Sequence, residues 1–193
     1  DGVYFQSWHH IVRWKRGAAT VVEADQKVRT SFAVRGSLYL WQHGRGIVVP
    51  RGDSLVSAPG FDRLTDKPVF AMLPEGEDNM LIGTYEDGLF RYADGAVHRL
   101  PNDLNSFLST NKLYGGVRLS PGMYAFGTLN GGVGLLGRRT GHARVIDASR
   151  GLQDERVYGL YSDSQGGLWA ALYNGITRTV VPSPVVVFDK RRG

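Results

Sequence analysis

Aromatic, amide and charged side chains stand beside short glycine-containing turns at several places in the sequence. Aromatic rings can stack on a sugar, and amide and guanidinium groups can donate hydrogen bonds to hydroxyl or carboxylate oxygens. We therefore expect these positions to form a ligand-binding site if the fold brings the turns together. The candidate ligand-binding residues are Trp8, His10, His43, Arg45, Tyr85, Glu86, Asn130, Tyr173 and Asn174.

Several of these candidates also have a structural interpretation. The rings of Trp8, Tyr85 and Tyr173 recur at equivalent places in the sequence, so they could pack within a repeated architecture. Asn130 and Asn174 precede glycine, and asparagine favours turns because its side chain hydrogen-bonds to nearby backbone. Packing and turn formation therefore stay open as alternatives to ligand contact.

Catalytic and metal-binding patterns do not emerge from the sequence. His9 and His10 are adjacent, so on a strand they would point to opposite faces, and the other histidines stand alone. No nucleophile, zinc-ligand or phosphate-loop motif is present, and no two carboxylates are marked out as an acid and base pair. We expect no catalytic residue, no metal and no cofactor in this chain.

Two further motifs have simple structural explanations. Asp163 opens the sequence Asp-Ser-Gln-Gly, which lacks the additional carboxylates of a calcium loop, so we expect Asp163 to brace a turn. The basic run at 137–141, GRRTG, is expected to be a solvated turn, with anion or nucleic-acid contact as the weaker alternative. We expect no nucleic-acid partner.

Composition favours a globular all-β chain. The 193 residues are 42% hydrophobic, and the 26 glycines against 8 prolines favour many turns between short strands. A net charge of +5 is modest for this length, and the sequence has no cysteine, which excludes disulfides and thiolate metal ligands. No apolar run approaches the roughly 20 residues of a membrane helix, so we expect the chain as given to be soluble, with any membrane attachment made through other segments.

A repeat of about 43 residues organises the sequence. The segments LYLWQHGRGIVV, LIGTYEDGLFRY, YAFGTLNGGVGLL and LWAALYNGITRTV share one design, and a fainter copy, VYFQSWHHIVRW, begins at residue 3. Equivalent glycines stand at 46, 88, 132 and 175, which are 42, 44 and 43 residues apart. Each clear copy is preceded by one apolar run and followed by another, including PVVVF at 184–188. The pattern predicts four strands in each repeat.

Four short strands joined by tight turns, repeated at this interval, are typical of a β-propeller blade. We expect a single all-β domain over 1–193, with repeats at about 1–29, 30–66, 67–111, 112–154 and 155–190. That makes about five blades, the first of them incomplete. The blades are expected to be part of a larger ring, with a closed five-bladed ring as the alternative.

The blade topology predicts where the candidate site lies. The turn between the second and third strands should share one face with the connection to the next blade, whereas the turn between the first and second strands should lie on the opposite face. All the candidate turns belong to the first kind. We therefore expect their side chains to converge on one mouth, with contributions from several blades.

The amino-acid sequence of the last clear repeat resembles that of the two-component regulator propeller repeats. The segment GLQDERVYGLYSDSQGGLWAALYNGITR, 151–178, follows their pattern almost throughout, whereas the copies at 81 and 124 keep a Gly-Thr pair that the first two copies replace. This resemblance implies the periplasmic sensory part of a bacterial inner-membrane receptor, whose membrane helix and output domain lie in other segments. It also implies that the larger ring has seven blades, and a possible homodimer formed through the full-length receptor.

These observations favour an extracytoplasmic module that binds a small polar or saccharide ligand, or a protein partner, without turnover. A propeller-fold carbohydrate-active enzyme, such as a glycoside hydrolase or lyase, is the first alternative and would need paired carboxylates or an arginine cluster near the ring centre. A rigid protein-interaction scaffold is the second alternative.

Overall fold

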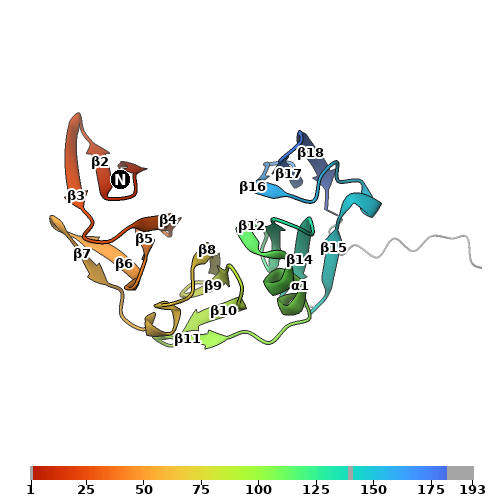
Figure 1. Ribbon diagram of the computed structural model, residues 1–193, viewed down its shortest axis with the longest axis horizontal. Helices are drawn as coiled ribbons and strands as arrows, with labels where there is room; N and C mark the ends of the chain where they lie inside the picture. Colours follow the sequence, from red (N-terminus) through yellow and green to blue (C-terminus); the bar gives the residue numbers. More distant parts are fainter. Residues whose placement is uncertain (1, 139–140, 182–193) are drawn as a thin grey trace, which may run out of the picture.

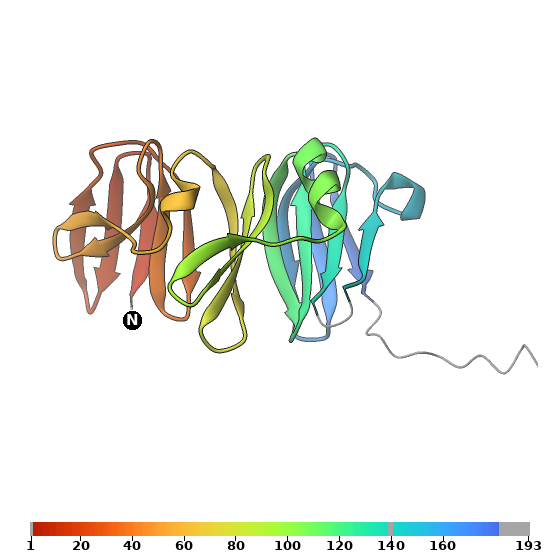
Figure 2. The ribbon, with the colours of Figure 1, turned by 90° about the horizontal axis from the view of Figure 1, so that it is seen from below.

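The computed structural model describes residues 2–138 and 141–181, and these residues form five antiparallel sheets arranged along an arc (Figure 1). The predicted all-β propeller architecture is confirmed. The expected last strand at 184–188 lies outside the described residues, as does part of the basic turn at 137–141. Seen from the side, the sheets stand next to one another with their strands running between the same two ends of the molecule (Figure 2).

We number the sheets as blades 1 to 5 along the chain. Blade 1 contains β1 (Val3–Gln6), β2 (His10–Lys15) and β3 (Ala18–Glu23). Blade 2 contains β4 (Val28–Val34), β5 (Ser37–Gln42), β6 (Gly46–Arg51) and β7 (Ser54–Ser57). Blade 3 contains β8 (Val69–Glu75), β9 (Asn79–Thr84), β10 (Gly88–Ala93) and β11 (Ala96–Arg99). Blade 4 contains β12 (Leu113–Ser120), β13 (Met123–Thr128), β14 (Val133–Gly137) and β15 (Ala143–Ile146). In blade 5 the described strands are β16 (Val157–Ser162), β17 (Gly167–Leu172) and β18 (Ile176–Val180).

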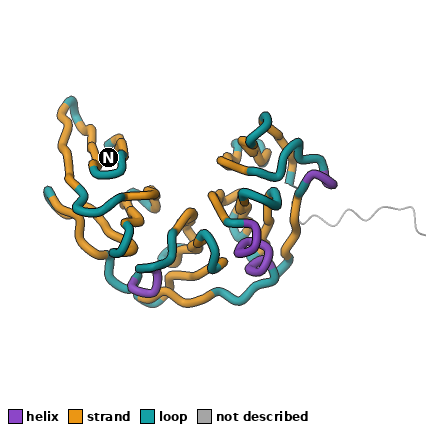
Figure 3. The backbone as a smooth tube through the Cα atoms, in the orientation of Figure 1, coloured by secondary structure: helices purple, strands orange, loops and turns teal. Residues whose placement is uncertain are grey.

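Within every blade the strands follow one another in sequence order and pair antiparallel. The first strands of blades 2 to 5, which are β4, β8, β12 and β16, line the inside of the arc, and the fourth strands of blades 2 to 4, which are β7, β11 and β15, lie on its outside (Figures 1 and 3). Blade 1 begins, in the described chain, with the strand equivalent to β5, because β1 leads through a tight turn into β2 as β5 leads into β6. Each blade therefore turns the hairpin between its second and third strands toward the same end.

The hydrophobic core is divided into four clusters, one at each junction between neighbouring blades. Leu81 on β9 and Ala125 on β13 are completely buried at the junctions with blades 4 and 5. These positions alternate with residues such as Ile82, which pack toward the preceding blade. Successive side chains on a strand point to opposite faces, so both faces of a central blade are apolar.

Because they head the same apolar run in every copy, Trp169 and its repeat equivalents Leu81, Ala125 and Tyr39 are predicted to lie buried between blades, and this prediction is wrong for Trp169. Leu81 and Ala125 are buried and Tyr39 is half-buried, but 38% of Trp169 is exposed. Trp169 lies on the face of blade 5 that points away from blade 4, where the Arg178 guanidinium carbon is 5.6 Å from the centroid of its ring. Trp169 thus has the same position on its strand as Leu81 and Ala125, but no further sheet of the described chain packs against it.

The connections between blades close the outer ends of the cores. The 3-10 helix η1 (Asp62–Leu64) buries Leu64, whose carbonyl accepts a hydrogen bond from Trp41 Nε1 at 3.1 Å. The α-helix α1 (Leu104–Asn111) was not anticipated from the sequence, and it buries Leu104 and Leu108 between blades 3 and 4. The last described connection contains the 3-10 helix η2 (Ala148–Arg150).

Charged side chains form hydrogen bonds between neighbouring blades at the end of the molecule opposite the hairpins between second and third strands. Glu75, at the end of β8, is mostly buried and accepts hydrogen bonds from Arg91 Nε at 2.6 Å and from Arg138 Nε of blade 4 at 2.5 Å. Arg35 of blade 2 donates to the Asn79 carbonyl of blade 3 at 2.8 Å. Burial would raise the pKa of Glu75, but the two arginines outweigh it, so the pKa is lowered and the carboxylate stays charged.

Candidate functional site

The turns between the second and third strands of all five blades lie at one end of the molecule, which we call the mouth. Its turns are 7–10, 43–45, 85–87, 129–132 and 173–175. In blades 2 to 5 the first backbone N–H of the turn donates to a carbonyl just before the first strand. The donor and acceptor pairs are His43 to Lys27 at 3.0 Å, Tyr85 to Pro68 at 2.8 Å, Leu129 to Asn111 at 3.0 Å and Tyr173 to Arg156 at 2.9 Å. These bonds hold each turn beside the entry to its own blade.

The Gly-Thr pair of the two central repeats has a structural explanation. Thr84 Oγ1 donates to the Gly88 carbonyl at 2.9 Å and accepts from the Asp87 N–H at 3.1 Å, and both groups belong to the turn. Thr128 makes the same two bonds, to the Gly132 carbonyl and from the Gly131 N–H. Each buried hydroxyl is therefore satisfied, and its turn is fixed from inside the blade.

A continuous row of aromatic rings runs along the inner strands beneath these turns. Phe70, Tyr114 and Tyr158 are the second residues of β8, β12 and β16. The ring centroids of Phe70 and Tyr114 are 5.0 Å apart, and those of Tyr114 and Tyr158 are 5.8 Å apart. The turn residues extend the row, because Tyr85 lies 5.4 Å from Phe70 and Tyr173 lies 6.4 Å from Tyr158. The row thus crosses three blades.

Cationic groups lie over the faces of mouth rings. Lys27 Nζ is 3.4 Å from the centroid of the Trp8 ring, and the Arg156 guanidinium carbon is 3.7 Å from that of Tyr173. The Arg29 guanidinium carbon is 5.1 Å from the centroid of Phe70 and 5.8 Å from that of Tyr85. Positive charge is attracted to the electron-rich face of an aromatic ring, so these cations are held in place without a carboxylate partner being required.

The structure brings some of the predicted site residues together at the mouth and leaves others apart. Trp8 and His43 line a cavity of about 430 Å³ at the mouth, and Tyr85 and Tyr173 belong to the aromatic row. Asn130 and Asn174 are exposed at the tips of their turns. His10 lies at the start of β2, where its backbone N–H donates to Ser7 Oγ at 3.1 Å.

Arg45 and Glu86 are engaged in ion pairs with other residues of the protein. Arg45 lies 3.0 Å from the Asp25 carboxylate and also donates to the Leu55 carbonyl at 3.1 Å. Glu86 lies 2.8 Å from the Lys112 ammonium. Both side chains lie at the mouth, as the blade topology implies, but these contacts give them a structural explanation and leave Arg45 little freedom to meet a ligand.

Sequence reasoning missed the inner-strand residues of the mouth. Arg29, Phe70, Tyr114 and Tyr158 occupy the second position of the first strand in blades 2 to 5. The signal was available, because the apolar residue that starts each of these strands is followed by arginine or an aromatic residue in VRT, VFA, LYG and VYG. The apolar pattern of these runs predicts a strand, but it does not show which side chains face the inside of an arc.

Two carboxylates at the mouth, Asp25 and Asp154, have pKa values below their ordinary range. A hydrogen bond from Gln42 is the main cause of the lowered pKa of Asp25, and one from Arg156 is the main cause for Asp154. A general acid needs the opposite environment, in which burial or a neighbouring negative charge raises the pKa. Among the described residues, no three His, Asp or Glu side chains are grouped to hold a metal ion.

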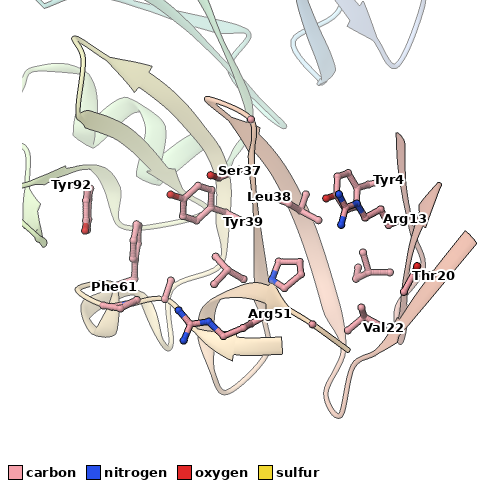
Figure 4. Close-up of a pocket in the computed structure, with 17 residues that line it drawn as sticks. Tyr4, Arg13, Thr20, Val22, Ser37, Leu38, Tyr39, Arg51, Phe61 and Tyr92 are labelled. Carbon is pink, nitrogen blue, oxygen red and sulfur yellow. The ribbon is translucent and has the colours of Figure 1, made fainter. Parts of the chain in front are cut away.

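A second hollow, of about 580 Å³, lies at the opposite end between blades 1 and 2. Tyr4 and Arg13 of blade 1 face Leu38 of blade 2 across it, and Phe61 and Tyr92 line its other side (Figure 4). The Arg13 Nε atom is buried and has no hydrogen-bond partner among the described residues. None of the predicted site residues contributes to this hollow.

Comparisons with solved structures identify the same architecture. The extracellular domain of the hybrid two component system BT3049 from B. thetaiotaomicron superposes with a TM-score of 0.67 at 11% identity, over 91% of this chain and 26% of that one. The extracellular domain of BT4673 from the same organism gives 0.67 at 13% identity, over 91% and 27%. PorZ, a surface component of the type-IX secretion system of Porphyromonas gingivalis, gives 0.55 at 13% identity, over 89% and 26%. The chain thus spans about a quarter of the length of these structures.

The sequence comparisons are more local than the structural ones. No curated protein matches the chain. None of the described helices is both long enough and apolar enough to cross a membrane. The family model described as two component regulator propeller matches residues 151–174, which begin just before β16 and end in the mouth turn of blade 5. This match confirms the resemblance stated above. Residues 151–174 of blade 5 are thus similar to a two component regulator propeller repeat, in a chain folded as a β-propeller arc.

Proposed function

We propose that the protein is an extracytoplasmic sensory module of a bacterial signalling receptor, and that it binds a small polar or saccharide ligand at the mouth without converting it. The observation that carries the proposal is the row of aromatic rings that crosses blades 3 to 5, flanked by cations on ring faces. The exposed rings of Tyr158 and Tyr173 suit stacking on a sugar, and neighbouring N–H donors suit its hydroxyl groups.

The repeat match and the structural likenesses support the signalling part of this proposal. The matched family model describes propellers of two component regulators, and two of the similar structures are extracellular domains of such systems. A domain of that kind would lie in the periplasm, where an extracellular or periplasmic metabolite reaches it directly. The homodimer of the full-length receptor that we expect from the resemblance would then couple ligand binding to the output domain.

The electrostatics of the mouth favour binding over catalysis. Asp25, Glu86 and Asp154 each lie within 3.3 Å of a basic nitrogen. A glycoside hydrolase needs one carboxyl group that stays protonated near neutral pH and a second that is ionised. The two of these groups with shifted pKa values, Asp25 and Asp154, are both shifted downward.

A saccharide library screened by thermal shift and calorimetry tests the proposal. We expect a subset of sugars to raise the thermal midpoint, and chromatography to recover them unchanged. Tyr173→Ala should weaken binding on the order of tenfold, as removal of a contact worth about 1.4 kcal/mol does. Tyr161→Ala is the matched control, because both tyrosines are largely exposed but Tyr161 lies further along β16, away from the mouth turns.

Two results would contradict the proposal. Formation of a cleaved sugar would assign the protein to the carbohydrate-active enzymes. Ligand contacts mapped by chemical shifts to the opposite turns, near Gly36, Glu77, Pro121 and Gln165, would instead point to a protein partner or neighbouring subunit at that end.

A further inference from the structure

The cavity at the mouth lies where two turns meet one connection. Trp8 comes from the turn of blade 1, His43 from the turn of blade 2, and Lys27 and Arg29 from the segment that enters β4 between them. The Val28 N–H donates to the Trp8 carbonyl at 2.8 Å, and the His43 N–H donates to the Lys27 carbonyl at 3.0 Å. The cationic segment is therefore fixed on both sides by main-chain bonds.

The charges in this cavity are all of one sign. Its lining contains Lys27 and Arg29 together with Trp8, Trp41 and His43, and it contains no carboxylate. Asp25 precedes Lys27 by two residues, but its Oδ1 atom accepts from Gln42 Nε2 at 2.8 Å and lies 3.0 Å from Arg45. Positive charge in the cavity is consequently not neutralised by the nearest carboxylate.

Other basic residues at the mouth differ in this respect. Lys67 lies 2.7 Å from Asp87, Lys112 lies 2.8 Å from Glu86, and Arg156 lies 3.3 Å from Asp154. Within the part of the chain that the structure describes, Lys27 and Arg29 form no ion pair with a carboxylate, and their charged groups lie over rings instead. A cation over a ring keeps N–H donors directed away from that ring, available to an anion.

We propose that this cavity binds the acidic group of an anionic saccharide, such as a uronate or a sulfated sugar. Lys27 and Arg29 supply charge-assisted hydrogen bonds to the oxyanion, and the exposed indole of Trp8 supplies an apolar wall beside the sugar ring. The inference rests on the proposed function, because it names the class of ligand that the mouth selects. It places the Lys27 contact between blades 1 and 2, whereas the Arg29 guanidinium lies over Phe70 and Tyr85 and so adjoins the aromatic row.

Matched pairs of ligands test this inference. Digalacturonate is compared with the neutral galactose disaccharide, and a sulfated disaccharide with its desulfated form, by calorimetry on the protein. We expect the acidic member of at least one pair to bind on the order of tenfold more tightly, the effect of one added charge-assisted contact. The difference should shrink as salt is raised from 50 to about 300 mM, because exposed charges are screened.

Variants then assign the effect to residues. Lys27→Gln and Arg29→Gln should each remove most of the preference for the acidic sugar. Lys27→Gln should also leave the affinity for the neutral sugar within about twofold, because Lys27 lies over Trp8 and not over a ring of the aromatic row. Lys67→Gln is the control, since it removes a lysine of the same face that is already paired with Asp87. Both lining residues are exposed, and circular dichroism checks that the variants fold.

The outcomes separate this inference from the proposed function. Equal affinity for acidic and neutral sugars, with binding still weakened by Tyr173→Ala, overturns the anion site and retains the saccharide sensor. A preference for acidic sugars that survives both Lys27→Gln and Arg29→Gln also overturns it. Absence of binding by every saccharide in the panel rejects the two proposals together.

Discussion

A single carboxylate organises the hairpin that opens the matched repeat. Asp163 Oδ1 accepts from the backbone N–H groups of Gln165 and Gly167 at 2.9 and 2.7 Å, and Oδ2 accepts from Trp169 Nε1 and Arg178 Nε at 2.9 and 3.0 Å. The indole and backbone donors, which favour the charged carboxylate, lower the pKa of Asp163 from its ordinary 3.8 to about 2. The expected role of Asp163 as a turn brace is confirmed by these contacts.

The charge of Asp163 should make stability depend on pH. Because the folded-state pKa lies below the ordinary value, ionised Asp163 stabilises the fold above about pH 4, and this contribution is lost as the pH falls toward about 2. Asp163→Asn should lower the thermal midpoint at neutral pH, with the difference from wild type shrinking between pH 4 and 2. Thermal scans across this range measure it, with Asp53→Asn, an exposed turn aspartate, as control. An unchanged midpoint at pH 7 would contradict the bracing role.

At the same scale, the sequence predicted the turn formers but not the ion pairs. Asp163 and its donors lie within 15 residues of one another, so local pattern was enough to interpret them. Arg45 and Asp25 are separated by 20 residues, and Lys112 and Glu86 by 26, and each pair forms only when a connection folds back over a turn. Such contacts depend on blade geometry that spacing alone does not give.

At the scale of the elements, the second strands of blades 3 and 4 show why the repeats keep a glycine, Gly83 or Gly127, at the same position. A Cβ atom added at Gly83 would lie 2.7 Å from Leu113 Cδ1, and one at Gly127 would lie 2.6 Å from Val157 Cγ1. In each case the obstructing side chain starts the first strand of the next blade. Neighbouring blades can therefore approach closely only where these positions have no side chain.

This close approach predicts opposite effects for two alanine substitutions. Gly127→Ala should destabilise the protein by about 1 to 3 kcal/mol, because the added methyl group overpacks the junction of blades 4 and 5. Gly159→Ala should be neutral or slightly stabilising, since its nearest neighbour would lie at 3.8 Å and alanine restricts the unfolded chain. Urea unfolding of the two variants compares them, and equal stabilities would show that the blades adjust their spacing freely.

The helix α1 is the element that the sequence analysis did not recognise. Leu104, Phe107 and Leu108 follow a helical spacing, and this signal was available in the sequence. It was overlooked because the segment was interpreted as a connection between repeats. The strands were predicted more securely because the same short apolar runs recur in four clear repeats. In the described chain an α-helix occurs in only one connection between blades.

For the molecule as a whole, stability resides in the junctions between blades. Leu81→Ala should cost about 2 to 5 kcal/mol, because the side chain is fully buried between blades 3 and 4. Trp169→Ala should cost about 1 kcal/mol although more atoms are removed, because the ring is partly exposed and loses mainly its bond to Asp163. Chemical denaturation of both variants gives the comparison. A larger loss for Trp169→Ala would mean that junction burial does not dominate.

The main-chain hydrogen bonds that hold each mouth turn beside the entry to its blade have a consequence for how such repeats diverge. These hydrogen bonds join main-chain atoms alone, so the side chain at the donating position has no part in holding the turn. Blades 2 to 5 carry His43, Tyr85, Leu129 and Tyr173 at this position. Duplicated copies can therefore accumulate substitutions at the mouth while the backbone stays in place. The chemistry of the mouth can therefore change by substitution at these positions while the fold is kept.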